Sequence, residues 1–81
     1  METPRVVLYS RPGCHLSDET REVIVAVRER VAFDLEEIDI DGSDELTREY
    51  GIRIPVVAVN GVEMWDYRVD RAEFEAAVRG T

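Results

Sequence analysis

A strand that turns directly into a helix is the feature that most limits the fold of this chain. Residues 6–10 form a largely apolar run, residues 11–13 form a loop that contains Pro-Gly, and an amphipathic segment follows. A continuous apolar run bounded by turn residues is typical of a buried central strand. Cys14, the only cysteine, stands where the helix begins, and the unpaired backbone N–H groups there favour a thiolate. Its position therefore indicates a reactive sulfur.

The composition restricts the class of protein. The chain has 81 residues, of which 44% are hydrophobic, so we expect a single small domain over residues 1–81. Its 18 acidic and 10 basic residues give a formal charge of −8. This charge argues against nucleic acid and against an anionic membrane surface as partners.

Cysteine usage and the length of the apolar runs indicate the compartment. A single cysteine cannot form an internal disulfide, and residues 1–5 lack the basic region and apolar run of a signal peptide. The apolar runs are far shorter than the ~20 residues of a membrane-spanning helix. We therefore expect a protein of the reducing cytoplasm.

Apolar periodicity and turn residues predict four strands and three helices. The strands are expected at residues 6–10, 33–40, 54–59 and 62–65, and the helices at residues 16–30, between Ser43 and Gly51, and between Asp70 and Gly80.

Short signals predict how the last two helices begin and end. Ser43 is expected to cap the N-terminus of its helix, and Gly51 to end that helix as a left-handed C-cap with Ile52 packed just beyond it. Asp70 and Glu73 resemble a capping box at the start of the last helix.

The order of elements predicts the sheet. A right-handed crossover makes the first two strands parallel neighbours, and the hairpin signal Asn60-Gly61 pairs the last two antiparallel. Residues 33–40 alternate imperfectly, which an edge position or a bulge explains. We therefore expect an α/β fold of order βαβαββα, a four-stranded mixed sheet with helices on both faces.

This order, together with four sequence segments, resembles the thioredoxin fold and more narrowly the small glutaredoxin-like proteins of bacteria. The segments are residues 8–16, 36–41, 50–56 and 60–61. The resemblance implies that Cys14 is the nucleophilic thiol and that Pro55 is a cis-proline beside it. It also implies that the backbone of Ile54 pairs with an extended thiol substrate.

Ser17 departs from the pattern of dithiol members, which carry a second cysteine at that place. A serine there is similar to monothiol glutaredoxins, but residues 14–17 lack their Gly-Phe pair and residues 64–70 lack their Gly-Gly element for glutathione. Residues 64–70 look closer to the Trp-containing segment of redoxins that serve ribonucleotide reductase. We expect no required cofactor, and glutathione as co-substrate stays open. Whether Ser17 is native or introduced to trap a mixed disulfide also stays open.

The residues around the thiol each have a functional and a structural interpretation. Cys14 is either reactive or a buried structural cysteine, and its place favours the first. The Ser17 hydroxyl either donates to the thiolate, caps the helix, or does both. Asp18 and Glu19 oppose the thiolate electrostatically. His15 is interpreted as a solvated residue at the helix start, and no metal site is predicted.

Four further residues are candidates for binding a substrate. Arg11 and Arg53 flank the expected site and either hold a carboxylate of a thiol peptide or are ordinary surface arginines. Trp65 and Tyr67 either face a partner or pack against the sheet, and packing is favoured for Trp65.

Three functions follow from these residues. The first is a thiol–disulfide oxidoreductase in monothiol form, whose Cys14 forms a mixed disulfide with a small or protein disulfide and is released by an external thiol. The second is a non-catalytic binding module that docks a partner near Trp65 and Tyr67. The third is an iron–sulfur carrier in which two chains each contribute Cys14. We expect a monomer, with a disulfide between the Cys14 residues of two copies as the route to a dimer.

Overall fold

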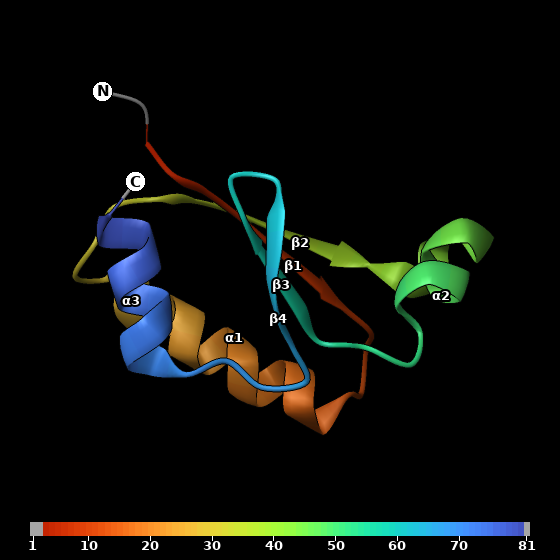
Figure 1. The fold of residues 1–81 in the computed structure, drawn as a ribbon. Coiled ribbons are helices and arrows are strands. Elements are labelled where there is room, and N and C mark those ends of the chain that lie inside the picture. The colour runs from red at the N-terminus through yellow and green to blue at the C-terminus, as the bar shows by residue number, and fades with distance from the viewer. Residues whose placement is uncertain (1–2, 81) are drawn as a thin grey trace.

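The computed structural model describes residues 3–80, which form one sheet and three α-helices (Figure 1). Met1, Glu2 and Thr81 lie outside the described residues, so part of residues 1–5, which were predicted to lack a signal peptide, also lies outside them. The elements in chain order are β1 (Arg5–Ser10), α1 (His15–Arg28), β2 (Asp34–Asp39), the 3-10 helix η1 (Ile40–Gly42), α2 (Asp44–Tyr50), β3 (Val56–Val59), β4 (Val62–Asp66) and α3 (Arg71–Arg79).

The sheet has the order β2-β1-β3-β4 and mixes both pairings. β1 pairs with β2 in parallel and with β3 antiparallel, and β3 pairs antiparallel with β4. The predicted α/β topology is thus confirmed. The imperfect alternation in the second strand is explained by the edge position of β2, because an edge strand has one hydrogen-bonded neighbour and more solvent contact.

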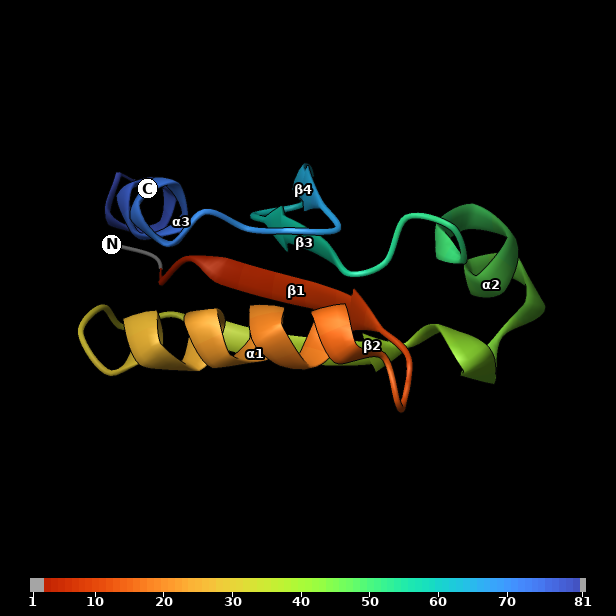
Figure 2. The same ribbon diagram turned by 90° about the horizontal axis from the view of Figure 1, so that it is seen from below.

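Two apolar clusters lie on opposite faces of the sheet, because consecutive residues of a strand point to opposite sides. Val57 belongs to the larger cluster, which α1 and α3 cover with side chains such as Ile24 and Phe74. Val56 belongs to the smaller cluster, which α2 covers with Tyr50. Figure 2 shows α1 alongside β1 and β2, whereas α2 lies at the far end of the molecule from α3. Helices therefore cover both faces, as expected.

Local signals place the turns and caps as the sequence predicts. Ser43 accepts a hydrogen bond from the backbone N–H of Leu46 at 3.3 Å. Asn60 and Gly61 have φ values of 51° and 84°, the positive values that a tight hairpin turn requires. The described helices are too short to cross a membrane; α1 has 14 residues against the ~20 that a bilayer demands.

The prediction of a left-handed cap at Gly51 was wrong. Gly51 has φ −55° and ψ −32°, so the chain keeps a right-handed turn, and Ile52 is 84% exposed instead of packed. Glycine is needed here for another reason: a Cβ at this position would lie 2.4 Å from the carbonyl oxygen of Thr47.

Asp70 caps α3 by accepting from the backbone N–H of Glu73 at 2.9 Å. We predict that Asp70→Ala lowers the free energy of unfolding by about 1 kcal/mol, because that N–H loses its partner. Urea denaturation measures the change. Asp70→Asn keeps a capping oxygen and serves as the control, which should stay close to the parent. Equal stability of the alanine variant and the parent would contradict the capping role.

Candidate functional site

Cys14 lies at the N-cap of α1, as its place in the sequence predicts. Its backbone is extended, with φ −83° and ψ 112°, and the loop before it turns through Gly13 at φ 79°. The N–H of Cys14 donates to the carbonyl of Arg11 at 3.2 Å, while its own carbonyl accepts from Asp18 at 3.1 Å. The thiol is partly exposed. It is therefore reachable from solvent and faces the free N–H groups of the first helical turn.

The pKa of the Cys14 thiol is lowered from its ordinary value. The largest cause is donation from the Ser17 hydroxyl, and the backbone N–H groups of Ser17 and Leu16 act in the same direction. Partial burial and the negative charge of Asp18 oppose this shift. The sequence analysis anticipated both the helix N–H groups and the opposing carboxylate.

The Ser17 side chain is fully buried and lies one turn from the sulfur. Among residues 3–80 its Oγ is the one buried side-chain polar atom that has no hydrogen-bond partner. A hydrogen bond to a charged acceptor is roughly twice as strong as one between neutral groups. We therefore infer that the Ser17 hydroxyl lowers the pKa of Cys14 by donating to the thiolate, and that it forms no hydrogen bond with the neutral thiol.

A small cluster of aromatic and aliphatic side chains packs against Cys14. Cys14 packs against the cluster that contains Tyr50, Ile54 and Val56, and the rings of Tyr9 and Tyr50 stack with centroids 4.1 Å apart. The sequence analysis did not single out Tyr50. Its position at the end of a short helix carries no periodic signal, so only the tertiary contact reveals it.

The segment before β3 carries the expected Ile-Pro pair. The peptide bond between Ile54 and Pro55 is cis. Ile54 is 9% exposed, and its N–H already donates to the carbonyl of Tyr50 at 3.1 Å. The N–H of Tyr67 donates to the carbonyl of Pro55 at 2.8 Å. Strand-like pairing with a substrate through the Ile54 N–H would therefore first require breaking its bond to Tyr50.

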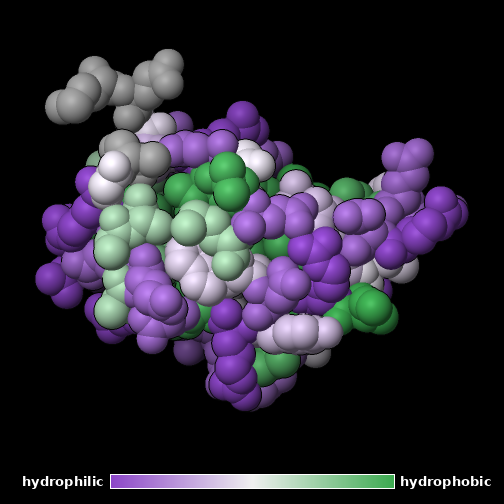
Figure 3. All heavy atoms as spheres, viewed as in Figure 1, coloured by the Kyte–Doolittle hydropathy of each residue, from purple (hydrophilic) through white to green (hydrophobic). Residues whose placement is uncertain are grey.

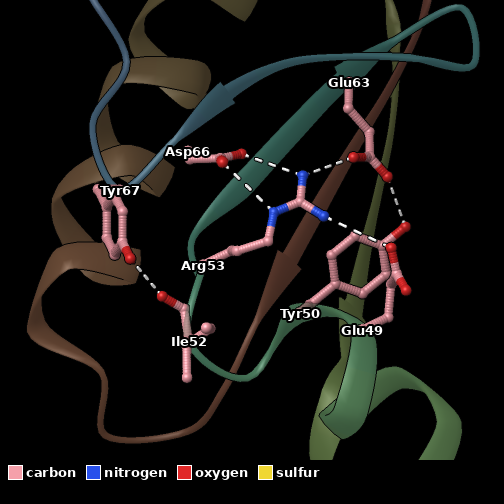
Figure 4. Close-up of polar contacts among 7 residues, drawn as sticks. All are labelled: Glu49, Tyr50, Ile52, Arg53, Glu63, Asp66 and Tyr67. Carbon is pink, nitrogen blue, oxygen red and sulfur yellow. Dashed lines mark hydrogen bonds and ion pairs between the residues drawn. The ribbon is translucent and has the colours of Figure 1, made fainter.

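Arg53 is held by three carboxylates (Figure 4). Its guanidinium lies 2.6 Å from Glu63, 3.3 Å from Asp66 and 3.6 Å from Glu49. Glu63 also accepts from the hydroxyl of Tyr50 at 2.7 Å. The Arg53 contact lowers the pKa of Glu63, and the Glu63 contact raises the pKa of Tyr50. The network joins α2, the loop before β3 and β4.

The two arginines expected near the site are thus already paired. Arg11 contacts Asp41 at 2.8 Å, and Arg53 contacts its three acidic partners. A carboxylate on a substrate would have to compete with these residues. Their ion pairs favour the structural interpretation over the binding one.

The two aromatic candidates lie in different environments. Trp65 is partly buried against the larger cluster, where its ring meets Phe74 edge-on at 5.8 Å. It therefore serves the core, which is the packing interpretation. Tyr67 is 51% exposed, has a positive φ of 65°, and donates through its hydroxyl to the carbonyl of Ile52 (Figure 4). Tyr67, which follows β4, is thus hydrogen-bonded to the loop before β3 that carries Arg53.

A pocket of ≈ 230 Å³ was not predicted from sequence; Leu16, two residues beyond Cys14, is one of its lining residues, whereas Cys14 is not. Its walls come from the first turns of α1 and from the connection between β4 and α3. The face of the molecule shown in Figure 3 is mostly hydrophilic, with small separate apolar patches. Within residues 3–80 no group of three potential ligands has the arrangement of a metal site. The lining residues are Leu16, Glu19, Thr20, Val23, Tyr67, Arg68 and Val69.

Comparison with known proteins places the chain in a family. The model of the "Glutaredoxin-like domain (DUF836)" matches residues 5–79. The chain is 31% identical to the uncharacterized protein Mb0520 of Mycobacterium bovis over 83 residues, which covers 96% of this chain and 86% of that protein.

Solved structures agree on the fold. The X-ray structure of the structural genomics target XcR50 from X. campestris has a TM-score of 0.78 and 30% identity, and the match covers 94% of this chain and 97% of that one. A mutant thioredoxin from Halobacterium salinarum has a TM-score of 0.72 at 15% identity, covering 98% and 74% of the two chains, and supports the fold alone. The chain therefore belongs to the glutaredoxin-like family and has a thioredoxin-like fold.

Proposed function

We propose that this protein carries out thiol–disulfide exchange through Cys14. The observation that carries the proposal is a partly exposed sulfur at a helix N-cap whose pKa is lowered by hydrogen-bond donors. The Cys14 thiolate attacks one sulfur of a disulfide. A new S–S bond forms, the old one breaks, and the departing sulfur leaves as a thiolate that takes up a proton.

The second half of the exchange needs another molecule. Cys14 is the only cysteine, and Ser17 has no sulfur with which to attack the mixed disulfide. An external thiol therefore attacks the substrate sulfur, which frees the Cys14 thiolate and leaves a new disulfide on the substrate. In this proposal the Ser17 hydroxyl stabilises the released Cys14 thiolate by donating a hydrogen bond to it. No bound cofactor takes part, and a reducing compartment such as the cytoplasm would supply the thiol.

The residues near the thiol divide into two groups in this proposal. Ile54 belongs to the cluster against which Cys14 packs, Pro55 follows it through a cis peptide bond, and the backbone N–H of Tyr67 donates to the Pro55 carbonyl. Arg11 and Arg53 are assigned to structural ion pairs. The family resemblance and the geometry of Cys14 favour exchange over a non-catalytic binding role, because a binding surface has no need of an activated thiol.

The rate of Cys14 alkylation by iodoacetamide should follow a pH curve whose midpoint lies below the ordinary thiol value of about 8.5. Ser17→Ala should move the midpoint upward, because the thiolate loses its largest stabilising donor. Ser10→Ala is the matched control, since the Ser10 hydroxyl is also buried but donates to Glu37 at 2.7 Å. A parent midpoint at or above the ordinary thiol value would overturn the activated thiol.

Reaction with 2-hydroxyethyl disulfide tests the exchange itself. The parent should gain one mercaptoethanol group per chain by intact mass, and dithiothreitol should remove it completely. Cys14→Ser should gain none, because it has no other thiol. Failure of the reduced, folded parent to form the adduct at neutral pH would reject exchange and leave the binding role.

A further inference from the structure

The first turns of α1 carry a charged pair on the side of the helix that bears the thiol. Asp18 stands four residues after Cys14, and Arg21 stands three residues after Asp18. Side chains three and four positions apart are neighbours on a helix, with Cβ atoms about 5–6 Å apart. The N–H of Asp18 also donates to the carbonyl of Cys14 at 3.1 Å. The Asp18 carboxylate therefore lies on the face of α1 that carries the sulfur.

Arg21 joins this carboxylate to the edge strand β2. Its Nη1 lies 2.8 Å from Oδ1 of Asp18. Its Nε and Nη2 donate to the two carboxylate oxygens of Glu37, with the Nε contact at 2.7 Å. A guanidinium that meets a carboxylate through two N–H groups is held in a defined geometry. Glu37 thus fixes the guanidinium while the third nitrogen contacts Asp18.

Glu37 is itself anchored close to the loop that carries the thiol. Ser10, the last residue of β1, is 3% exposed and donates through its hydroxyl to Glu37 at 2.7 Å. The Arg21 and Ser10 contacts lower the pKa of Glu37, and the Glu37 and Asp18 contacts raise the pKa of Arg21. Both groups of the Arg21–Glu37 pair therefore stay charged at neutral pH.

Asp18 opposes the Cys14 thiolate, but only weakly. Among the effects on the pKa of Cys14, the negative charge of Asp18 is the smallest and acts less than partial burial does. A carboxylate beside a fixed cation exerts a smaller net field than a free one, because the two charges partly cancel at a third site. The position of Arg21 gives Asp18 such a cation.

The other titratable groups around the sulfur come from β1, α2, the loops on either side and the first turn of α1. The phenol of Tyr50 keeps its proton at neutral pH, because a hydrogen bond to Glu63 raises its pKa. Arg11 is paired with Asp41. The remaining groups are Tyr9, Arg53 with its three acidic partners, and the exposed His15 and Glu19.

We propose that Arg21 is a positioning residue that acts on Cys14 through Asp18: its guanidinium, fixed by Glu37, neutralises the Asp18 carboxylate and so keeps that charge from opposing the thiolate. This inference rests on the exchange function proposed for Cys14, because the thiolate is the attacking species in that exchange. It assigns a role in the reaction to an arginine that is remote from the loop before β3.

A double-mutant cycle tests the coupling, with the pH midpoint of Cys14 alkylation by iodoacetamide as the readout. Arg21→Gln should raise the midpoint by about half a pH unit, because the Asp18 charge then acts without its partner. Asp18→Asn alone should change the midpoint by less than half as much. The double variant should have the midpoint of Asp18→Asn, because Arg21 then has no charge to neutralise. A merely structural role of Arg21 would persist without the Asp18 charge.

Two control variants separate this effect from a general change of charge or packing. Arg5→Gln removes one positive charge from another ion pair between β1 and β2, since Arg5 contacts Glu36 at 2.9 Å at the start of β1. Ser10→Ala leaves both oxygens of Glu37 available to Arg21. Both variants should keep the parent midpoint, and circular dichroism verifies that every variant folds.

The outcomes separate this inference from the proposed function. An unchanged midpoint in Arg21→Gln overturns the inference, and so does a rise that is undiminished in the double variant. If Arg21→Gln does not fold, Asp18→Asn decides, because a fall of about half a pH unit or more would mean that Asp18 is not neutralised in the parent. Failure of the parent to react with 2-hydroxyethyl disulfide rejects exchange, whereas the alkylation midpoints still decide the role of Arg21.

Discussion

The central position of β1 is the constraint on which the rest of the structure depends. β1 is paired on both edges, and its side chains enter both apolar clusters: Val6 and Leu8 the larger one, Tyr9 the smaller. Because β1 is fixed on all sides, the loop that follows it starts from a rigid point. That loop places Cys14 at the N-terminus of α1, where it packs against the smaller cluster.

The surroundings of the thiol are assembled by hydrogen bonds between segments that are distant in sequence. Arg53 draws together α2 and β4 through Glu49, Glu63 and Asp66, and Tyr67 holds the carbonyl of Pro55. These contacts occupy the Arg53 guanidinium and the Pro55 carbonyl, which are thus already bonded within the chain. The site that results has a thiol whose pKa is lowered, and the guanidinium groups of Arg11 and Arg53 beside it are paired with carboxylates.

Sequence patterns predicted the features that depend on neighbours along the chain. The caps at Ser43 and Asp70 and the hairpin at residues 60–61 follow from local geometry, so each was found correctly. Gly51 was assigned the wrong conformation, because a glycine after a helix indicates either a positive φ or a backbone atom so close to its Cα that a Cβ would not fit. The two are distinguished by the fold alone, in which a Cβ at residue 51 would lie only 2.4 Å from the Thr47 oxygen.

The sequence by itself determined the order of elements and the place of Cys14 at a helix start, since hydrophobic periodicity and turn residues act over a few positions. The tertiary structure decided which polar groups remain available around that thiol. The Ser17 hydroxyl is buried without a hydrogen-bond partner among the described residues, whereas Arg53 is paired with three carboxylates. Burial and ion pairing depend on segments brought together by packing, and no local pattern encodes them.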